Sequence, residues 1–165
     1  MIAALLLAAG ASSRMGRSKL QLDLKGRTVL ERAVDGLLAS PVELILVIAA
    51  PGAAGSPLGR GDPRLRVLSN PRPEEGMASS IRAGMKALPG EARAVLLALA
   101  DKPLVRPDTI TAVVACFEKT AAAIVYPTYQ GEQGHPVLVA STLFAELQKL
   151  QGDVGAKSLL GAQAA

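Results

Sequence analysis

Short apolar runs alternate along the chain with stretches in which apolar residues recur every three or four positions. The runs cover residues 2–8, 43–49, 65–68, 94–100 and 122–126, and each is almost continuously apolar. A strand with only one buried face would instead alternate apolar and polar residues. The pattern therefore indicates strands that are covered on both faces, as in a mainly parallel sheet.

Three amphipathic stretches, at residues 28–38, 78–88 and 108–118, lie between these runs. Within each stretch the apolar residues fall on one helical face, and Thr28 is a candidate N-cap. Strands that alternate with helices predict an α/β domain built on a doubly wound, mainly parallel sheet. Such sheets bind ligands in the crevice at the carboxyl ends of their strands.

The composition excludes several classes of function. Apolar residues make up 50% of the 165 residues, but aromatic residues only 2%. Single-stranded nucleic acid is bound on aromatic stacking platforms, of which this chain has almost none. No uncharged stretch without Gly or Pro approaches the ~20 residues that cross a membrane. No basic residue precedes the N-terminal apolar run, as one would in a secretory signal. We therefore expect a cytoplasmic protein that binds neither nucleic acid nor membrane.

The chain has one cysteine, Cys116, and one histidine, His135. These numbers exclude a disulfide framework and a zinc site built from cysteine and histidine. Because Cys116 adjoins Phe117 in a predicted helix, we expect it to pack rather than to react.

The formal net charge is +4, and the whole excess lies in the first half of the chain. Five cations fall in one short stretch that is broken only by Asp23: Arg14, Arg17, Lys19, Lys25 and Arg27. A concentration of positive charge attracts anions. Long nucleic acids usually require basic residues spread across a face, so the stretch favours a small polyanion.

The loop after the first apolar run carries the strongest chemical signal, in the sequence LAAGASSRMGRSK at residues 7–19. Small residues at the end of a strand let backbone N–H groups approach a phosphate or a base. Arg14 can bind two phosphate oxygens at once, and Lys19 adds a mobile point charge. The spacing matches neither the Walker A motif nor G-x-G-x-x-G. The alternative is a glycine-rich connector with solvated cations.

Two further segments of the chain carry candidate ligand-binding residues. Gly76 and Ser80 stand at the start of the second helix, where backbone and hydroxyl donors suit an anion or a polar base edge; alternatively, Ser79 or Ser80 only caps the helix. Asp101 follows an apolar strand and would face the same crevice, where a carboxylate suits Mg²⁺. The alternative for Asp101 is an exposed turn residue.

The last candidates lie near the C-terminus. Gly134 and His135 belong to a glycine-rich stretch at residues 126–138, which is typical of a binding loop. Asp153, further along the chain, is the remaining candidate. The alternatives to a binding role are that His135 is a surface turn residue and that Asp153 is an ordinary N-cap.

The run at residues 7–19 resembles the N-terminal signature of the MobA-like nucleotidyltransferases, L-A-[AG]-G-x-S-x-R-M-G-x-x-K. The segments NPRPEEGMASS (70–80), LADKP (99–103), GHPV (134–137) and GDVGAK (152–157) are similar to further elements of that family. The resemblance implies the Rossmann-like fold of nucleotide-diphospho-sugar transferases. It also implies a role for each candidate: triphosphate binding by Arg14 and Lys19, nucleotide binding by Ala8, Ala9, Gly10, Gly76 and Ser80, Mg²⁺ binding by Asp101, and acceptor binding by Gly134, His135 and Asp153.

Within the family, the Ala8-Ala9 pair and the GHPV and GDVGAK segments resemble the cytidylyltransferase of the molybdenum cofactor. The resemblance implies transfer of CMP from CTP to molybdopterin with release of pyrophosphate, and molybdoenzymes or their chaperones as partners. The alternatives are transfer from GTP, transfer to a sugar or polyol phosphate, and a non-catalytic protein that binds and delivers the nucleotide or the cofactor.

The sequence departs from the family pattern at two places. Lys102, beside the expected metal ligand, replaces a neutral residue, and its charge would weaken Mg²⁺ binding unless it points away or binds phosphate. The second departure is a C-terminal D-[IV]-D-T-P-x-D segment that the chain lacks. We therefore expect residues 1–165 to form a single nucleotidyltransferase-like domain that lacks the C-terminal strand of its family.

Overall fold

The computed structural model describes residues 1–10, 19–52, 61–156 and 158–159. Six strands form its central sheet in the order β3-β2-β1-β4-β8-β5. They are β1 (Ile2–Ala8), β2 (Leu44–Ala49), β3 (Leu65–Ser69), β4 (Ala94–Leu99), β5 (Ile124–Val125) and β8 (Val137–Ala140). The first four strands are mutually parallel, whereas β8 pairs antiparallel with both β4 and β5. The mainly parallel sheet predicted from the apolar runs is confirmed.

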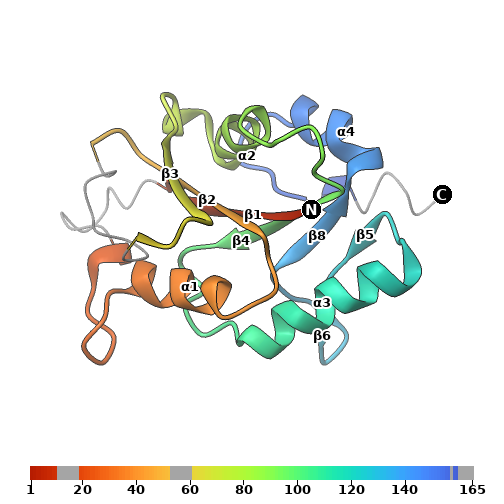
Figure 1. Cartoon of the computed structure of the whole chain (residues 1–165). Helices are drawn as coiled ribbons and strands as arrows, with labels where there is room; N and C mark the ends of the chain where they lie inside the picture. Colours follow the sequence, from red (N-terminus) through yellow and green to blue (C-terminus); the bar gives the residue numbers. More distant parts are fainter. Residues whose placement is uncertain (11–18, 53–60, 157, 160–165) are drawn as a thin grey trace.

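Helices cover both faces of this sheet (Figure 1). One face packs against α1 (Val29–Leu38) and α3 (Pro107–Thr120), and the other against α2 (Met77–Lys86) and α4 (Phe144–Lys149). Alternate residues of β1 serve the two cores: Ile2, Ala4 and Leu6 pack on the α1 and α3 side, and Ala3 and Leu5 on the α2 and α4 side. A strand buried on both faces must be apolar at every position, which explains the continuous runs.

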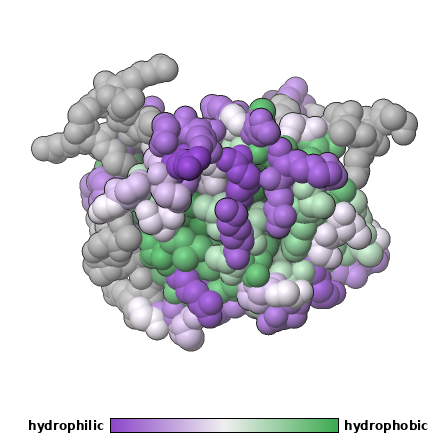
Figure 2. All heavy atoms as spheres, turned by 90° about the horizontal axis from the view of Figure 1, so that it is seen from above, coloured by the Kyte–Doolittle hydropathy of each residue, from purple (hydrophilic) through white to green (hydrophobic). Residues whose placement is uncertain are grey.

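Smaller elements complete the fold. Among the described residues, single-turn 3₁₀ helices occur at Lys19–Gln21 (η1), Pro73–Glu75 (η4) and Ser141–Leu143 (η5), and a hairpin is formed by β6 (Thr128–Tyr129) and β7 (Glu132–Gln133). On the face above α2 and α4, hydrophilic side chains are scattered with apolar atoms exposed between them (Figure 2). No helix in the described part of the chain is long and apolar enough to cross a membrane.

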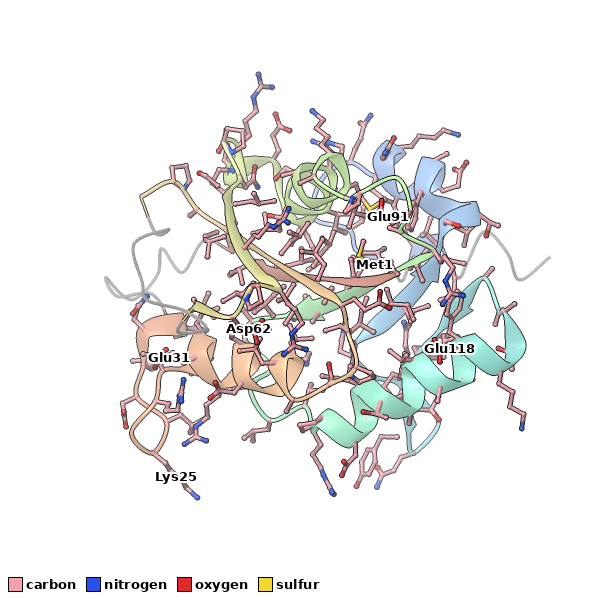
Figure 3. The ribbon with its side chains drawn as sticks, viewed as in Figure 1. Met1, Lys25, Glu31, Asp62, Glu91 and Glu118 are labelled. Carbon is pink, nitrogen blue, oxygen red and sulfur yellow. The ribbon has the colours of Figure 1, made fainter. Side chains whose placement is uncertain are left out.

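The start of α1 confirms the N-cap predicted at Thr28. The Thr28 hydroxyl accepts a hydrogen bond from the Glu31 N–H at 3.1 Å, and the Glu31 carboxylate accepts one from the Thr28 N–H at 2.7 Å. This reciprocal pair is a capping box, which satisfies two backbone donors at the helix start. In the turn before it, Lys25 points away from the molecule (Figure 3).

Arg64 joins the segment before β3 to the end of α1. Its guanidinium donates to the Leu38 carbonyl at 2.9 Å and to the Val42 carbonyl at 3.3 Å, and it forms an ion pair with Asp62 at 3.0 Å. The hydrogen bonds from Arg64 lower the pKa of the Asp62 carboxyl below its ordinary value of 3.8. Asp62 therefore holds the arginine in place while the arginine satisfies backbone carbonyls (Figure 3).

Three local predictions need correction. The stretch at 126–138, interpreted as a turn, contains the β6–β7 hairpin and the first residues of β8. The strand predicted at 122–126 shortens to Ile124–Val125, the two residues that pair with β8. Cys116 is exposed rather than packed, because α3 turns Val113, Val114 and Phe117 toward the core and Cys116 lies on the opposite side.

Candidate functional site

A cavity of about 610 Å³ opens at the carboxyl edge of the sheet. The adjacent strands β1 and β4 bring two loops together there, and the Ala100 N–H donates to the Leu7 carbonyl at 3.1 Å just beyond β4. Fourteen residues line the cavity: Leu7, Ala8, Ala9, Gly10, Lys19, Leu20, Pro73, Glu74, Gly76, Met77, Ser80, Leu99, Asp101 and Asp153. The volume lies in the range of small-molecule sites in proteins, about 300–1,000 Å³.

The cavity gathers most of the residues that the sequence singled out. Eight of them line it: Ala8, Ala9, Gly10, Lys19, Gly76, Ser80, Asp101 and Asp153. They come from five separate segments: the end of β1, η1, the start of α2, the loop after β4 and the segment after α4. Arg14 lies outside the described residues.

Gly134 and His135 are not among the residues that line this cavity. His135 lines a much smaller hollow between β4, α1 and α3, together with Lys102 and Pro136. Leu99 borders both spaces. Lys102 lines the small hollow and is not among the residues that line the cavity of Asp101.

Charge is unevenly distributed among the described residues that line the cavity. Lys19 is the one cation, and Glu74, Asp101 and Asp153 supply three carboxylates. Glu74 and Asp153 flank the wall formed by the start of α2, which carries only the uncharged Gly76, Met77 and Ser80. This wall repels phosphate and suits a neutral polar group.

The residues at Asp101 fit a divalent cation that is shared with a ligand. Asp101 is exposed on the cavity wall directly after β4 and Ala100. In the described part of the chain, no group of three or more His, Cys, Asp or Glu side chains could enclose a metal. Mg²⁺ is commonly held by one or two protein carboxylates together with substrate phosphates and water, so a single carboxylate fits that mode and not an all-protein cage.

The start of α2 uses within the protein two of the backbone donors that were expected to suit an anion or a polar base edge. The Ala78 N–H donates to the Gly152 carbonyl at 3.1 Å, and the Met77 N–H donates to Asp153 Oδ1 at 3.3 Å. These backbone donors are therefore already used within the protein. Gly76 holds the N-cap position of α2, and the Asp153 side chain, from a distant part of the chain, accepts a hydrogen bond from the first helical N–H.

Gly76 makes this contact possible. It has a φ of 85° and a ψ of −173°, a region open essentially to glycine alone. A Cβ at this position would lie 2.6 Å from the Gly152 carbonyl carbon and 2.7 Å from the Asp153 nitrogen. Gly76 thus lets the segment at 152–153 approach the start of α2 and close one wall of the cavity.

Asn70 is a residue of the site that the sequence analysis did not single out. It follows β3 and is only 1% exposed, and its amide nitrogen donates to Ser79 Oγ at 2.8 Å and to Ser80 Oγ at 3.0 Å. Its Oδ1 accepts from the Arg72 N–H at 3.0 Å. Its position two residues beyond the strand predicted at 65–68, at the edge where the ligand was expected, was the available signal. The contacts also show that neither serine is the N-cap, because the cap position is Gly76.

An open, mainly parallel sheet with a small-residue loop, a lysine and a carboxylate at its carboxyl edge is the arrangement of a nucleotide-binding α/β protein. The profile of the MobA-like NTP transferase domain matches residues 4–165. The chain belongs to this family of nucleotidyltransferases.

Two curated relatives illustrate the range of the family. The purine catabolism protein PucB of Bacillus subtilis is 32% identical over 165 residues, covering 93% of this chain and 78% of that protein. The molybdenum cofactor cytidylyltransferase of Escherichia coli is 27% identical over 136 residues, covering 82% and 68%. Their names differ, so the family is shared while the substrate of this chain is left open.

Solved structures agree with the fold. The crystal structure of Rv0371c from Mycobacterium tuberculosis superposes with a TM-score of 0.85 at 26% identity, covering 99% of this chain and 83% of that one. A second crystal structure of Rv0371c, in complex with manganese, superposes with a TM-score of 0.79 at 25% identity and covers the same shares. That relative therefore binds a divalent metal.

Proposed function

We propose that the protein transfers CMP from CTP to the terminal phosphate of molybdopterin. An oxygen of that phosphate attacks the α-phosphorus of CTP, the bond from the α-phosphorus to the oxygen that bridges to the β-phosphorus breaks, and pyrophosphate leaves. The products are a cytosine dinucleotide form of the cofactor and pyrophosphate. The observation that carries the proposal is the single cavity in which the Ala8–Gly10 turn, Lys19 and Asp101 meet.

The choice of CTP and molybdopterin is supported by sequence similarity. The Ala8-Ala9 pair and the segments at 134–137 and 152–157 resemble the cytidylyltransferase branch, and a relative with that name is 27% identical. In this proposal Asp153, Gly134 and His135 serve the acceptor, and molybdoenzymes or their chaperones receive the product.

The chemistry requires charge neutralisation and alignment more than acid–base catalysis, because a phosphate acceptor is already ionised near neutral pH. Arg14 and Lys19 neutralise the departing pyrophosphate, and the backbone of Ala8, Ala9 and Gly10 positions the nucleotide. Asp101 would hold Mg²⁺, which supplies charge stabilisation across the phosphates when bound. The volume of about 610 Å³ is large enough for a nucleotide and part of an acceptor.

The decisive experiment measures pyrophosphate release with Mg²⁺, molybdopterin and each nucleoside triphosphate in turn. Release with CTP alone supports the proposal, and release with GTP alone overturns the choice of nucleotide. Release only when a sugar or polyol phosphate replaces molybdopterin overturns the acceptor. Absence of release with every pair, despite nucleotide binding, overturns catalysis and indicates a delivery protein.

A pair of lysine variants tests the site itself. Lys19 lines the cavity, whereas Lys25 lies at the tip of a turn and points away from the molecule (Figure 3). Removing a charged contact to the leaving group costs about 3 kcal/mol, or about 100-fold in rate. We therefore expect that Lys19→Ala slows pyrophosphate release by this factor and that Lys25→Ala does not; equal rates for the two variants would contradict the assignment.

A further inference from the structure

Asn70 donates to the hydroxyl oxygens of two serines in the first turn of α2, Ser79 and Ser80. The Asn70 amide is fixed in one orientation, because the Arg72 N–H must meet an acceptor and does so at Oδ1, 3.0 Å away. Both protons of the amide nitrogen then point at Ser79 Oγ and Ser80 Oγ. Each serine oxygen is therefore an acceptor from Asn70 and keeps one proton to donate.

The hydroxyl groups of Ser79 and Ser80 differ in whether they have a hydrogen-bond acceptor within the described part of the protein. Ser79 Oγ donates to the Gly76 carbonyl at 2.8 Å, and the Ser79 N–H donates to the same oxygen at 3.1 Å. These two donors occupy both lone pairs of that carbonyl. A buried helical serine commonly donates to a carbonyl three or four residues earlier. For Ser80 these are the Met77 carbonyl, to which no hydrogen bond from Ser80 is present among the described residues, and the Gly76 carbonyl, which Ser79 occupies.

The Ser80 hydroxyl consequently has no backbone carbonyl to which it donates in the described part of the chain. It is 4% exposed, it lines the cavity, and among the hydrogen bonds of the described residues it has no acceptor for its proton. We propose that Asn70 is a positioning residue that makes Ser80 an obligate hydrogen-bond donor into the cavity, where it selects a neutral acceptor atom of the nucleoside, a carbonyl oxygen or ring nitrogen of the base or a sugar oxygen.

The surrounding charge favours the nucleoside over the phosphates. Glu74 and Asp153 line the cavity together with Ser80, and Asp153 contacts the start of the same helix through the Met77 N–H, whereas the cavity residue Lys19 belongs to η1. The carboxylate of Asp153 at the start of α2 disfavours a phosphate there. This inference rests on the proposed function, since it assumes that the cavity holds a nucleotide.

The test reverses the polarity of the contact. Asn70→Asp replaces the two donors with an acceptor, so Ser80 would turn its proton toward the carboxylate and away from the ligand. We expect Asn70→Asp and Ser80→Ala each to weaken CTP binding about tenfold, the contribution of one hydrogen bond. The double variant should bind no more weakly than either single variant, because both lose the same contact.

Three further measurements make the test specific. Binding of inorganic tripolyphosphate with Mg²⁺ should be unchanged in Ser80→Ala. Asn70→Ala, which removes the donors without adding an acceptor, should cost less affinity for CTP than Ser80→Ala. Ser40→Ala is the matched control: Ser40 is a buried serine that donates to the Leu37 carbonyl at 2.6 Å, outside the cavity, so its loss should lower the melting temperature and leave CTP affinity intact.

The outcomes separate the inference from the function on which it rests. If Ser80→Ala weakens CTP binding and Asn70→Asp, folded as judged by its melting transition, does not, the role of Asn70 is overturned. An equal loss of tripolyphosphate affinity in Ser80→Ala would overturn the assignment to the nucleoside. If the unaltered protein binds neither CTP nor GTP by calorimetry, the proposed function fails, and the inference with it.

Discussion

Replacing Gly76 with alanine tests whether the cavity wall depends on close backbone contact. The new Cβ would lie 2.6 Å from the Gly152 carbonyl carbon and 2.7 Å from both the Gly152 oxygen and the Asp153 nitrogen. These are backbone atoms, so no side chain can rotate to relieve the contact. The segment at 152–153 must move away from α2.

The cost has two parts. Holding a non-glycine residue at a φ of 85° and a ψ of −173° costs of order 1–3 kcal/mol. Displacing Gly152 and Asp153 also removes the hydrogen bonds from the Ala78 and Met77 N–H groups, each contributing about 1 kcal/mol. The total is about 4 kcal/mol, a large share of the about 5–15 kcal/mol that stabilises a typical domain.

Urea denaturation followed by circular dichroism measures this loss, with an expected drop in the midpoint of about 2 M. Gly131→Ala is the matched control, since Gly131 has a similar φ of 82° but open space around its Cβ position. We expect the control to lose only the conformational part, about 1–2 kcal/mol. Equal destabilisation by the two variants would refute the contact argument.

Three other predictions concern the site and the scaffold. Asp101→Ala should reduce pyrophosphate release at least 100-fold at an unchanged melting temperature; wild-type rates at saturating Mg²⁺ would exclude Asp101 as the metal ligand. Asp62→Asn should be less stable than the unaltered protein near neutral pH. Because Arg64 lowers the pKa of Asp62 in the folded state, this contribution is full above the unfolded value of 3.8 and fades as the pH falls below it, so the gap between the two urea midpoints should close in acid; a gap independent of pH would contradict the linkage. Thr28→Ala should lose about 1 kcal/mol in urea denaturation by removing the capping box, and Thr28→Ser should lose little; equal losses would show that the hydroxyl is not responsible.

The parallel strands can be predicted from the sequence because a strand that is buried on both faces is apolar at nearly every position. Ile2–Ala8 is predicted with its observed bounds, and Leu44–Ala49 and Ala94–Leu99 to within one residue at an end. Strand β8 was not predicted. It has four residues, and it adjoins a stretch whose glycines indicate a loop. Its place between β4 and β5 depends on pairing across the chain, which periodicity does not record.

The candidate site, too, could be predicted only in part. Lys19 and Asp101 were predicted to share a cavity because each follows a strand that ends at the same edge of the sheet, and they do share one. The roles of Asn70 and of the segment at 152–153 could not be predicted, because each depends on hydrogen bonds to residues of α2. A carboxylate that accepts the Met77 N–H from 76 residues away leaves no pattern in the local sequence.

The antiparallel strand β8 also constrains the order in which the sheet can assemble. Among the described residues, β5 is hydrogen-bonded to the sheet through β8 alone. Ile124 and Val125 therefore cannot join the sheet until residues 137–140, made later on the ribosome, have paired with β4. Pairing of β8 with β4 closes a longer loop than pairing of β8 with β5, so the longer loop governs when this edge joins the sheet.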